Sequence, residues 1–576
     1  MKIKTIPRIL FIVFYFSFLQ YAHTETIHYT DGQDHIAPIV LTEDTFLSID
    51  AGVATQSGQI TEDGGSFGIT KIGAGTLVMA NEDGNNSYSG STAVEAGSLR
   101  MGNDYAVQYT SVAISEGATF DLDGYFTEWN GLSGEGTLHF GENGGFYLYS
   151  GGEFSGTLTG QGTLLYNGTE NFTLSGNSDF SSGSLSIYSG QVTSAGDSSF
   201  AGLSVDGGIF EVAGGTTTLA DSIYISSSDL SQLEVTEGGF LKIDGSGYAG
   251  LWMGTGTGES GVVEVRDAGS RLQAKEVEVS AEGKGTLTLA GGGQLIVNGE
   301  EGIVQLASIS SGEGTLNIGA ASGETAVAPG VVQANAVDTA EGVGKLVFNH
   351  SATDYYFTHN GMEEGTAVLI TGNTEVLIEK GVTTLVGRNT YSGGTLVSGG
   401  TLIISDVGDG YSVLGSGAVE IGENGILSGS GTILGDTTVF GMVVFGDSAE
   451  EMHFDDDLSL SSSSTVEMRL SSLSDFNHMV VDGVLAYEGI LSIRFSDGYL
   501  PDLHASFGLF DAGSFLSDTQ FHSIVFSIAG YEGSFHYETG TLTITAVPEP
   551  SISALLAIAF FLGMFLWVRR GCVRKT

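Results

Sequence analysis

The sequence predicts an all-β protein: a solenoid of short stacked strands that ends in a β cap and has a membrane-directed segment at each end. Glycine supplies 89 of the 576 residues, and only 15 % of the residues are charged. Short runs of alternating apolar and polar residues are broken by glycine throughout the body, which is typical of strands joined by tight turns. No long window between the two ends has helical periodicity. These observations favour many short strands around an apolar interior.

Internal repeats predict that the strands form the coils of a solenoid. Asn86–Met101, NSYSGSTAVEAGSLRM, matches Asn389–Ile404, NTYSGGTLVSGGTLII, with Asn, Tyr-Ser-Gly, Thr, Val, Gly and Leu in register. Looser units at Gln232–Ile243, Gly261–Leu272 and Gly285–Ile296 share one plan of strand, glycine turn and strand. A unit of about 20–30 residues cannot bury its apolar face alone, so it must stack on its neighbours.

The Tyr-Ser-Gly-Gly-Thr-Leu-Val unit resembles the autotransporter-associated β-strand repeat, and the resemblance covers most of residues 67–440. Gly117–Leu138, Gly312–Val337 and Gly344–Phe357 are similar to the same passenger sequences. The resemblance implies a right-handed parallel β-helix with a pectin-lyase-like fold. Autotransporters end in a translocator barrel. This chain ends in a different signal, so we expect no translocator barrel and another route across the outer membrane.

Residues 1–22 are predicted to be a secretory signal peptide. Three basic residues precede the apolar stretch Ile9–Leu19, and small or polar residues follow around Ala22. This order of charge, apolar core and small residues directs export, and the core is too short to span a bilayer.

Residues 552–568 are uncharged and almost wholly apolar, which predicts a short transmembrane helix. A basic cytoplasmic tail, 569–576, follows and opens with Arg569 and Arg570. Basic residues stay in the cytoplasm by the positive-inside rule, so we expect the body outside it.

The motif Val547-Pro548-Glu549-Pro550-Ser551 stands directly before this helix, in a chain with only six prolines. Prolines cannot continue a strand ladder and hold the chain extended, so the motif stays open to a processing enzyme. Motif, helix and basic tail together resemble the PEP-CTERM sorting signal of Gram-negative bacteria. The resemblance implies processing by an exosortase-type enzyme, a transient inner-membrane anchor, and delivery to the cell surface or extracellular matrix.

These features divide the chain into five parts. Glycine becomes scarcer from about Met452, while Phe, His and Asp become more frequent. The last edge of a solenoid needs protection, so we expect a cap with antiparallel pairing there. The predicted parts are the signal peptide (1–22), an N-terminal cap region (23–66), the β-helix (67–451), the C-terminal β cap (452–546) and the sorting signal (547–576).

The charge of the body excludes two classes of partner. Between Glu25 and Glu549 the chain has 68 acidic and 12 basic residues, a formal charge of −56. Such a body repels nucleic acid and anionic lipid, so neither is an expected partner. The single cysteine, Cys572, lies beyond the apolar segment, so the body has neither a disulfide nor a thiolate metal site.

We expect no cofactor, beyond weak binding of Ca²⁺ to the acidic surface. Asp121-Leu122-Asp123-Gly124 begins like a calcium loop but lacks the later ligands, so a strand that ends in an Asp-Gly turn is favoured. A second acidic group could hold Ca²⁺ loosely, although a solvated loop is the favoured interpretation. Its members are Asp447, Glu450, Glu451, Asp455, Asp456 and Asp457.

The sequence contains no readable catalytic constellation. Gly64–Gly68 fits G-x-S-x-G without the strand and helix that a nucleophile elbow needs, and Gly256–Gly261 fits G-x-G-x-x-G without a βαβ unit. We therefore expect a secreted structural or adhesive β-helix that is not an enzyme and whose partners include extracellular polysaccharide.

Two alternatives to this function stay open. One is a polysaccharide-active glycosidase or lyase, because folding could bring a pair of the abundant carboxylates together. The other is a glycan- or ice-binding module that presents a regular face of threonines from the Gly-Thr-Leu tripeptides. Varying coil lengths weaken the match of such a face to a lattice.

Overall fold

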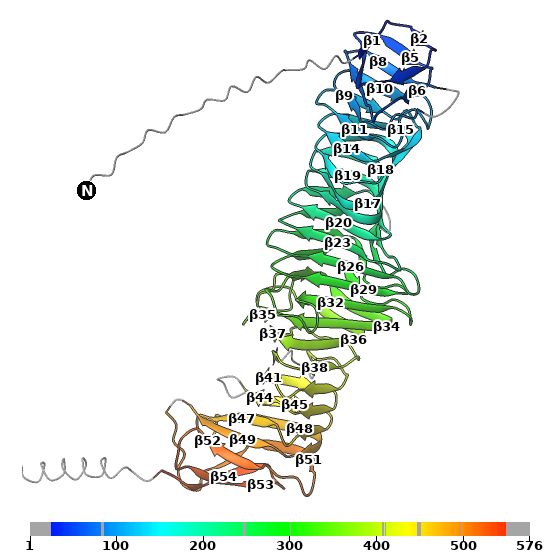
Figure 1. The fold of residues 1–576 in the computed structure, drawn as a ribbon. Helices are drawn as coiled ribbons and strands as arrows, with labels where there is room; N and C mark the ends of the chain where they lie inside the picture. Colours follow the sequence, from blue (N-terminus) through cyan, green and yellow to red (C-terminus); the bar gives the residue numbers. More distant parts are fainter. Residues whose placement is uncertain are drawn as a thin grey trace, which may run out of the picture.

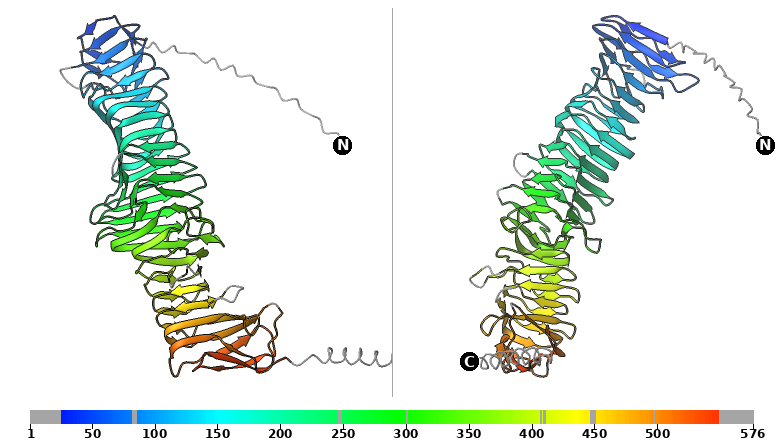
Figure 2. Two further views of the ribbon diagram at one scale, coloured as in Figure 1. Left: turned by 180° about the vertical axis from the view of Figure 1, so that it is seen from behind. Right: turned by 90° about the vertical axis from the view of Figure 1, so that its left-hand side faces the viewer.

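The computed structural model describes residues 25–548, except 82–85, 246–248, 300, 406–407, 409–410, 446–450 and 497. The strands lie across the long axis of an extended, gently bent rod and follow one another from its N-terminal to its C-terminal end (Figures 1 and 2). Within these residues the chain forms strands and turns and no helix. The largest sheet has 41 strands, and its neighbours pair in parallel. This confirms an all-β fold of stacked parallel coils.

The most regular coils span residues 223–333, where each coil contributes three strands and each strand from β22 to β31 pairs with the third strand after it. Val235, Val265, Leu289 and Ile318 occupy one column of this register and are fully buried. Successive side chains of a strand alternate, so such columns fill the interior while their neighbours face outward. The strands are β22 (Ile223–Ile225), β23 (Ser231–Thr236), β24 (Phe240–Ile243), β25 (Gly250–Met253), β26 (Ser260–Val265), β27 (Arg271–Ala274), β28 (Glu276–Glu278), β29 (Lys284–Leu289), β30 (Gln294–Val297), β31 (Ile303–Gln305), β32 (Glu313–Gly319) and β33 (Val331–Gln333).

Parallel stacking is already present at the N-terminal end. The stretch predicted as an N-terminal cap region contains six strands, and its first strand pairs in parallel with the fourth. The N-terminal strands are β1 (Glu25–Tyr29), β2 (Asp34–His35), β3 (Ile39–Leu41), β4 (Thr45–Ile49), β5 (Val53–Gln56), β6 (Ile60–Glu62), β7 (Ile69–Ile72), β8 (Thr76–Met79), β9 (Thr92–Val94), β10 (Ser98–Met101), β11 (Ser111–Ile114) and β12 (Thr119–Asp121).

Longer strands follow, several of which continue around a corner of the coil with a shift in register. Large aromatic side chains fill the interior here: the Trp129 and Phe146 ring centroids are 4.4 Å apart, as are those of Phe140 and Phe180. These strands are β13 (Phe126–Trp129), β14 (Gly131–Gly134), β15 (Thr137–Leu148), β16 (Gly152–Phe154), β17 (Thr157–Leu174), β18 (Ser178–Ser194), β19 (Ser198–Val205), β20 (Gly208–Ala213) and β21 (Thr216–Leu219).

The asparagine of the Asn-x-Tyr-Ser-Gly repeat joins three successive coils. The Asn389 side chain accepts a hydrogen bond from the Ile370 amide at 2.8 Å and donates one to the Val413 carbonyl at 2.7 Å. The Tyr391 hydroxyl is 2.6 Å from the Thr395 hydroxyl in the interior. Asn86 and Tyr88 make the equivalent bonds, to Ile60, Ala106 and Thr92. The repeated residues therefore satisfy buried polar groups where the chain turns.

The glycine of the Gly-Thr-Leu tripeptides lies where the backbone of the preceding corner passes closely. A Cβ atom at Gly285 would lie 1.4 Å from the Val279 carbonyl oxygen, and one at Gly314 would lie 1.8 Å from that of Leu306. Any side chain would displace the neighbouring backbone, which explains why this glycine recurs.

The solenoid continues well beyond Met452, and here the prediction of antiparallel pairing throughout residues 452–546 is wrong. Met452, Phe454 and Leu458 keep the alternation that stacks a strand on its neighbours, so these strands extend the parallel ladders. The strands are β34 (Ala336–Asn349), β35 (Tyr355–Tyr356), β36 (Leu369–Lys380), β37 (Val382–Thr384), β38 (Thr395–Val397), β39 (Thr401–Ile404), β40 (Val419–Ile421), β41 (Ile426–Gly429), β42 (Gly431–Ile433), β43 (Thr437–Val439), β44 (Met442–Val444), β45 (Glu451–Phe454), β46 (Leu458–Leu460), β47 (Thr465–Leu470), β48 (His478–Ala486), β49 (Ile490–Phe495), β51 (Phe510–Phe515) and β52 (Ser523–Phe526).

Among the described strands, antiparallel ladders form a small sheet at the end, made of β50 (Ser506–Gly508), β53 (Glu532–His536) and β54 (Thr541–Ala546), while isolated antiparallel bridges occur elsewhere. An aromatic cluster lies beside it, centred on Tyr487. The Tyr487 ring centroid is 5.1–5.8 Å from those of Phe510, Phe515, Phe521, Phe535 and Tyr537.

Both predicted membrane-directed segments fall outside the described residues: the signal peptide, 1–22, and the apolar segment with its basic tail, 552–576. In the part of the chain that the structure describes, no helix has the length and apolarity needed to cross a membrane.

Candidate functional site

The predicted sorting motif begins directly after the last strand. β54 ends at Ala546, and Val547 and Pro548 follow it as irregular chain, with Val547 exposed. The remaining motif residues, Glu549, Pro550 and Ser551, and the basic residues Arg569 and Arg570 lie outside the described residues. The structure therefore places only the start of this motif.

The two glycine-rich motifs of the sequence, Gly64–Gly68 and Gly256–Gly261, lie at turns before strands. A strand, β7, follows Gly64–Gly68, and the Ser66 hydroxyl accepts a hydrogen bond from Ser89 at 3.0 Å. Gly256–Gly261 begins in the turn between β25 and β26 and ends in the first two residues of β26, and its Gly258 has a positive φ of 82°. Neither segment has the surroundings of a nucleophile elbow or a nucleotide-binding loop.

The segment that begins like a calcium loop is a turn at the end of β12. One Asp121 carboxylate oxygen is 3.0 Å from the Arg100 Nε atom, and the other accepts a hydrogen bond from the Asp123 amide. Asp123 and Gly124 have φ angles of 49° and 84°. The Asp-Gly turn favoured by the sequence is confirmed.

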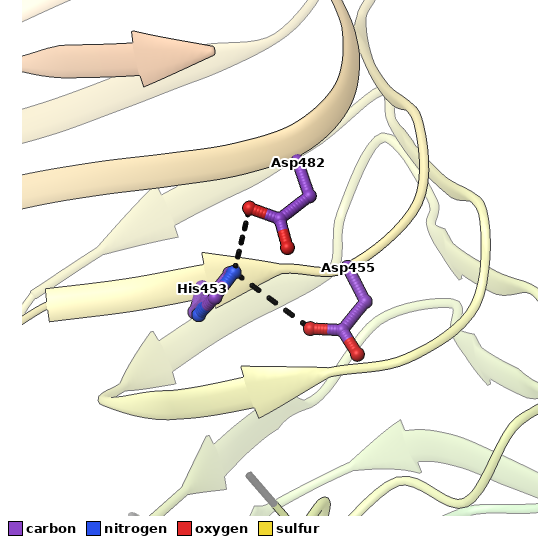
Figure 3. A group of neighbouring side chains, drawn as sticks. All are labelled: His453, Asp455 and Asp482. Carbon is purple, nitrogen blue, oxygen red and sulfur yellow. Dashed lines mark ion pairs between the residues drawn. The ribbon is translucent and has the colours of Figure 1, made fainter. Parts of the chain in front are cut away.

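A histidine and two aspartates from neighbouring coils converge near the C-terminal end of the rod (Figure 3). His453 lies on β45, Asp455 follows that strand, and Asp482 lies in β48 where its register with β51 shifts between Val481 and Val484. The His453 Nε2 atom is 3.1 Å from an Asp482 oxygen and 3.7 Å from an Asp455 oxygen. The three ligand atoms lie within 4.8 Å of one another. An irregular register of this kind re-aims a side chain, here toward the histidine.

This His453 cluster has the ligand types of a transition-metal site. Zn²⁺ accepts imidazole nitrogen and carboxylate oxygen together, whereas Ca²⁺ prefers oxygen alone. The three side chains are 34–61 % exposed, so water screens their charge. Such an open arrangement suits loose cation binding.

The members of the predicted acidic group make different contacts in the structure. Among the members of this group that the structure describes, only Asp455 belongs to the His453 cluster. Asp457 accepts a hydrogen bond from the Val484 amide at 2.7 Å, and Glu451 lies 3.2 Å from the His478 ring. Asp447 and Glu450 lie outside the described residues. His453 and Asp482 were missed, and the available signal was a His-x-Asp pair followed, one coil later, by another aspartate.

A groove lies on the outward face of β25, β28 and β31, in the most regular part of the rod. Trp252, Glu278 and Gln305 occupy one column of the parallel register, a coil apart from one another. Glu276 shares its strand with Glu278 and points to the same face. The groove has a volume of about 870 Å³. It is lined by Trp252, Lys275, Glu276, Val277, Glu278, Asn298, Gly299, Glu301, Gly302, Ile303 and Gln305.

The two strand carboxylates of the groove have different surroundings. Burial raises the pKa of Glu278, the Ser308 hydroxyl opposes this by donating to the carboxylate, and the charge of Glu276 raises the pKa further. The Lys275 ammonium donates to the Gly245 carbonyl oxygen. Three lining carboxylates therefore face one ammonium that is already engaged by the backbone.

Sequence reasoning missed this groove. The available signal was Glu276-Val277-Glu278, whose two acids alternate onto one face of a strand, together with Trp252 in the preceding coil. Their alignment depends on an offset of 26 positions from Trp252 to Glu278, and only the strand register fixes that spacing.

The fold and the corner residues define a parallel β-solenoid built from passenger-type repeats. The passenger-associated-transport-repeat family matches residues 69–101 and 380–404. These ranges contain the two segments on which the resemblance to autotransporter-associated repeats was based, so that prediction is confirmed.

Two curated proteins are similar in sequence to part of this chain. The Adhesin BmaC autotransporter of Brucella suis biovar 1 (strain 1330) is 34 % identical over 292 residues, which is 46 % of this chain and 8 % of that protein. The Uncharacterized lipoprotein YdeK of Escherichia coli (strain K12) is 35 % identical over 219 residues, which is 37 % of this chain and 15 % of that protein. The matches thus span a small share of either relative's length.

Proposed function

We propose that this protein is an exported, non-catalytic β-helix with a structural or adhesive role at the cell surface or in the extracellular matrix. The observation that carries the proposal is the similarity of nearly half of the chain to an autotransporter adhesin, in coils of the passenger type. The similarity to a lipoprotein also favours an exported protein. The proposal includes the right-handed coil of that fold and contact with extracellular polysaccharide.

The test is incubation of the purified full chain with a panel of polysaccharides and with cells of the native host. Retention on cells or matrix without release of oligosaccharides supports the proposal. Release of soluble oligosaccharides that disappears when a groove carboxylate is replaced would overturn it.

We further propose that an exosortase-type enzyme reads the C-terminal signal, with residues 552–568 as a transient inner-membrane anchor. The end of the β ladder at Ala546 supports this, because the motif starts directly after the last strand, where Val547 is exposed. The test replaces Pro548, Glu549 and Pro550 with alanine in the native host. Accumulation of unprocessed protein in the inner membrane supports the proposal, and unchanged processing and delivery would contradict it.

A polysaccharide-active enzyme is the second candidate, and one observation favours it. Glu276 and Glu278 share a groove, and the raised pKa of Glu278 is a property of a general acid. Both carboxylates stand side by side on one strand rather than on opposite walls, which favours the non-catalytic role. Hydrolysis of a polysaccharide by the wild type that is lost in Glu278→Gln would support the enzymatic function.

We propose that no cofactor is needed and that divalent cations bind only loosely, at the acidic surface and the His453 cluster. Titration calorimetry of the full chain with CaCl₂ and with ZnCl₂ tests this. Weak binding that falls in His453→Ala supports the cluster as one such position. Tight, stoichiometric binding of either cation would contradict it.

A further inference from the structure

We infer that the groove over β25, β28 and β31 binds an uncharged oligosaccharide, with Trp252 as its stacking platform. This inference deepens the proposed adhesive role and rests on it for its biological meaning. The binding itself follows from the side chains that the coils bring together.

The arrangement of the groove comes from the parallel register. Trp252 pairs with Glu278, and Glu278 pairs with Gln305, so these side chains form a row along the rod. Neighbouring members of the row are about 4.8 Å apart, because that is the spacing of hydrogen-bonded strands. A linear ligand lying along the rod would therefore meet an aromatic ring, a carboxylate and an amide in succession.

Trp252 is unlike the other described tryptophan. Trp129 is fully buried, whereas Trp252 is partly exposed on the outward face. Its indole nitrogen is shielded and has no hydrogen-bond partner among the described residues. Tyr224 precedes Trp252 in the register and is 49 % exposed, which extends the aromatic surface by one coil. Rings of this kind offer an apolar face beside polar groups, which matches the C–H face and the hydroxyls of a sugar.

The polar lining selects against acidic sugars. Glu276, Glu278 and Glu301 carry negative charge, while the one lining ammonium, Lys275, is bound to the Gly245 carbonyl oxygen. Carboxylates accept hydrogen bonds from hydroxyl groups but repel other anions. The groove thus favours ligands rich in hydroxyl donors and without acidic groups. Its volume of about 870 Å³ suits several sugar rings.

The test uses the full chain with three hexasaccharide probes: cellohexaose, the N-acetylated chitohexaose, and hexagalacturonate as the acidic comparison. Calorimetry gives the affinity, and a fluorescence change that is lost in Trp252→Phe reports on the groove, because that variant keeps Trp129 and Trp567. We expect saturable binding of at least one neutral probe, a fluorescence change on binding, and weaker binding of hexagalacturonate.

Three variants and a control locate the binding. Trp252→Ala should weaken binding of the neutral probe about tenfold or more, and Glu276→Gln should weaken it several-fold. Trp252→Phe should retain most of the affinity while losing the fluorescence change. Tyr105→Ser removes an exposed aromatic ring outside the groove and should leave the affinity unchanged. Thermal unfolding checks each variant, and if Trp252→Ala fails to fold, Trp252→Phe and Glu276→Gln decide.

Three results would overturn the inference: no binding of either neutral probe, unchanged affinity in the groove variants, or preference for hexagalacturonate. Its failure is distinguishable from that of the adhesive role. Retention on cells or matrix without binding of either neutral probe would overturn the groove alone. Neutral-probe binding at the groove without any retention on cells or matrix would support the groove and contradict adhesion.

Discussion

At the residue scale, we expect the corner asparagine of the repeat, Asn389, to stabilise the coils around it. Asn389→Ala leaves the buried Ile370 amide and Val413 carbonyl without a side-chain partner. We expect a loss of about 3 kcal/mol in unfolding free energy of the surrounding coils, measured by native-state hydrogen exchange. Ser392→Ala, an exposed change in the same motif, should stay within about 0.5 kcal/mol of wild type. Undiminished protection of the Ile370 amide would contradict the assigned role.

A buried histidine gives the fold a dependence on pH. Burial lowers the pKa of His350 to about 4, against an opposing hydrogen bond with the Ala352 backbone. As pH falls below about 6.5, His350 becomes protonated in the unfolded chain but stays neutral in the folded chain until about pH 4. The free energy of unfolding therefore decreases across that window. We expect this residue to account for about 3 kcal/mol of the loss between pH 7 and pH 4.

The measurement is urea unfolding at both pH values for wild type, His350→Gln and His536→Gln. The acid loss should shrink in His350→Gln, which can still hydrogen bond to Thr383, the partner of the His350 ring. It should be unchanged in His536→Gln, where the histidine is exposed. An equal acid loss in all three proteins would refute the assignment.

At the element scale, the glycines near the start of strands allow the chain to turn tightly at the corners of the coil. Gly285→Ala would place a Cβ 1.4 Å from the Val279 carbonyl oxygen, so the backbone at the corner between β28 and β29 must shift. We expect a loss of about 3 kcal/mol or more, measured by urea unfolding. Gly202 lies within β19, and a Cβ there would meet nothing within 4 Å. Gly202→Ala should therefore be nearly neutral, and equal effects of the two changes would contradict the explanation.

The cap element contains a polar group that its aromatic cluster does not satisfy. The Tyr487 hydroxyl is buried, and no described residue provides a hydrogen-bond partner. We expect Tyr487→Phe to stabilise the C-terminal end by about 1 kcal/mol, because it removes an unpaired buried group and keeps the ring contacts. Tyr487→Ala should destabilise it by about 3–5 kcal/mol. Thermal unfolding measures both, and destabilisation by Tyr487→Phe would reveal a partner for the hydroxyl.

The elements also show how far the sequence could predict the molecule. The stacked parallel strands could be predicted because alternation and the Asn-x-Tyr-Ser-Gly corner recur along the chain. The antiparallel cap was placed too early because the change in composition at Met452 leaves the alternation of Phe454 and Leu458 intact. The groove could not be predicted because turn lengths between Trp252, Glu276 and Gln305 vary, and a one-residue change would turn any of them to the other face.

At the scale of the whole molecule, charge is the dominant property. The body between Glu25 and Glu549 has a formal charge of −56, and rods of like charge store repulsion between neighbouring coils. Raising NaCl from 10 to 150 mM shortens the screening length from about 30 to about 8 Å. We expect the thermal midpoint to rise by about 2 °C or more. Choline chloride should act equally, and a midpoint independent of both salts would contradict stored repulsion.

The repetition of coils along one axis has a consequence for reach. Each coil lengthens the rod by about 4.8 Å and contacts only the coils beside it. Gain or loss of a whole coil therefore changes the length of the rod, while the contacts between the remaining coils stay the same. The groove lies far from both ends, and the number of coils between it and an end of the rod sets its distance from that end. Evolution can change that distance by adding or removing coils, without changing the residues of the groove.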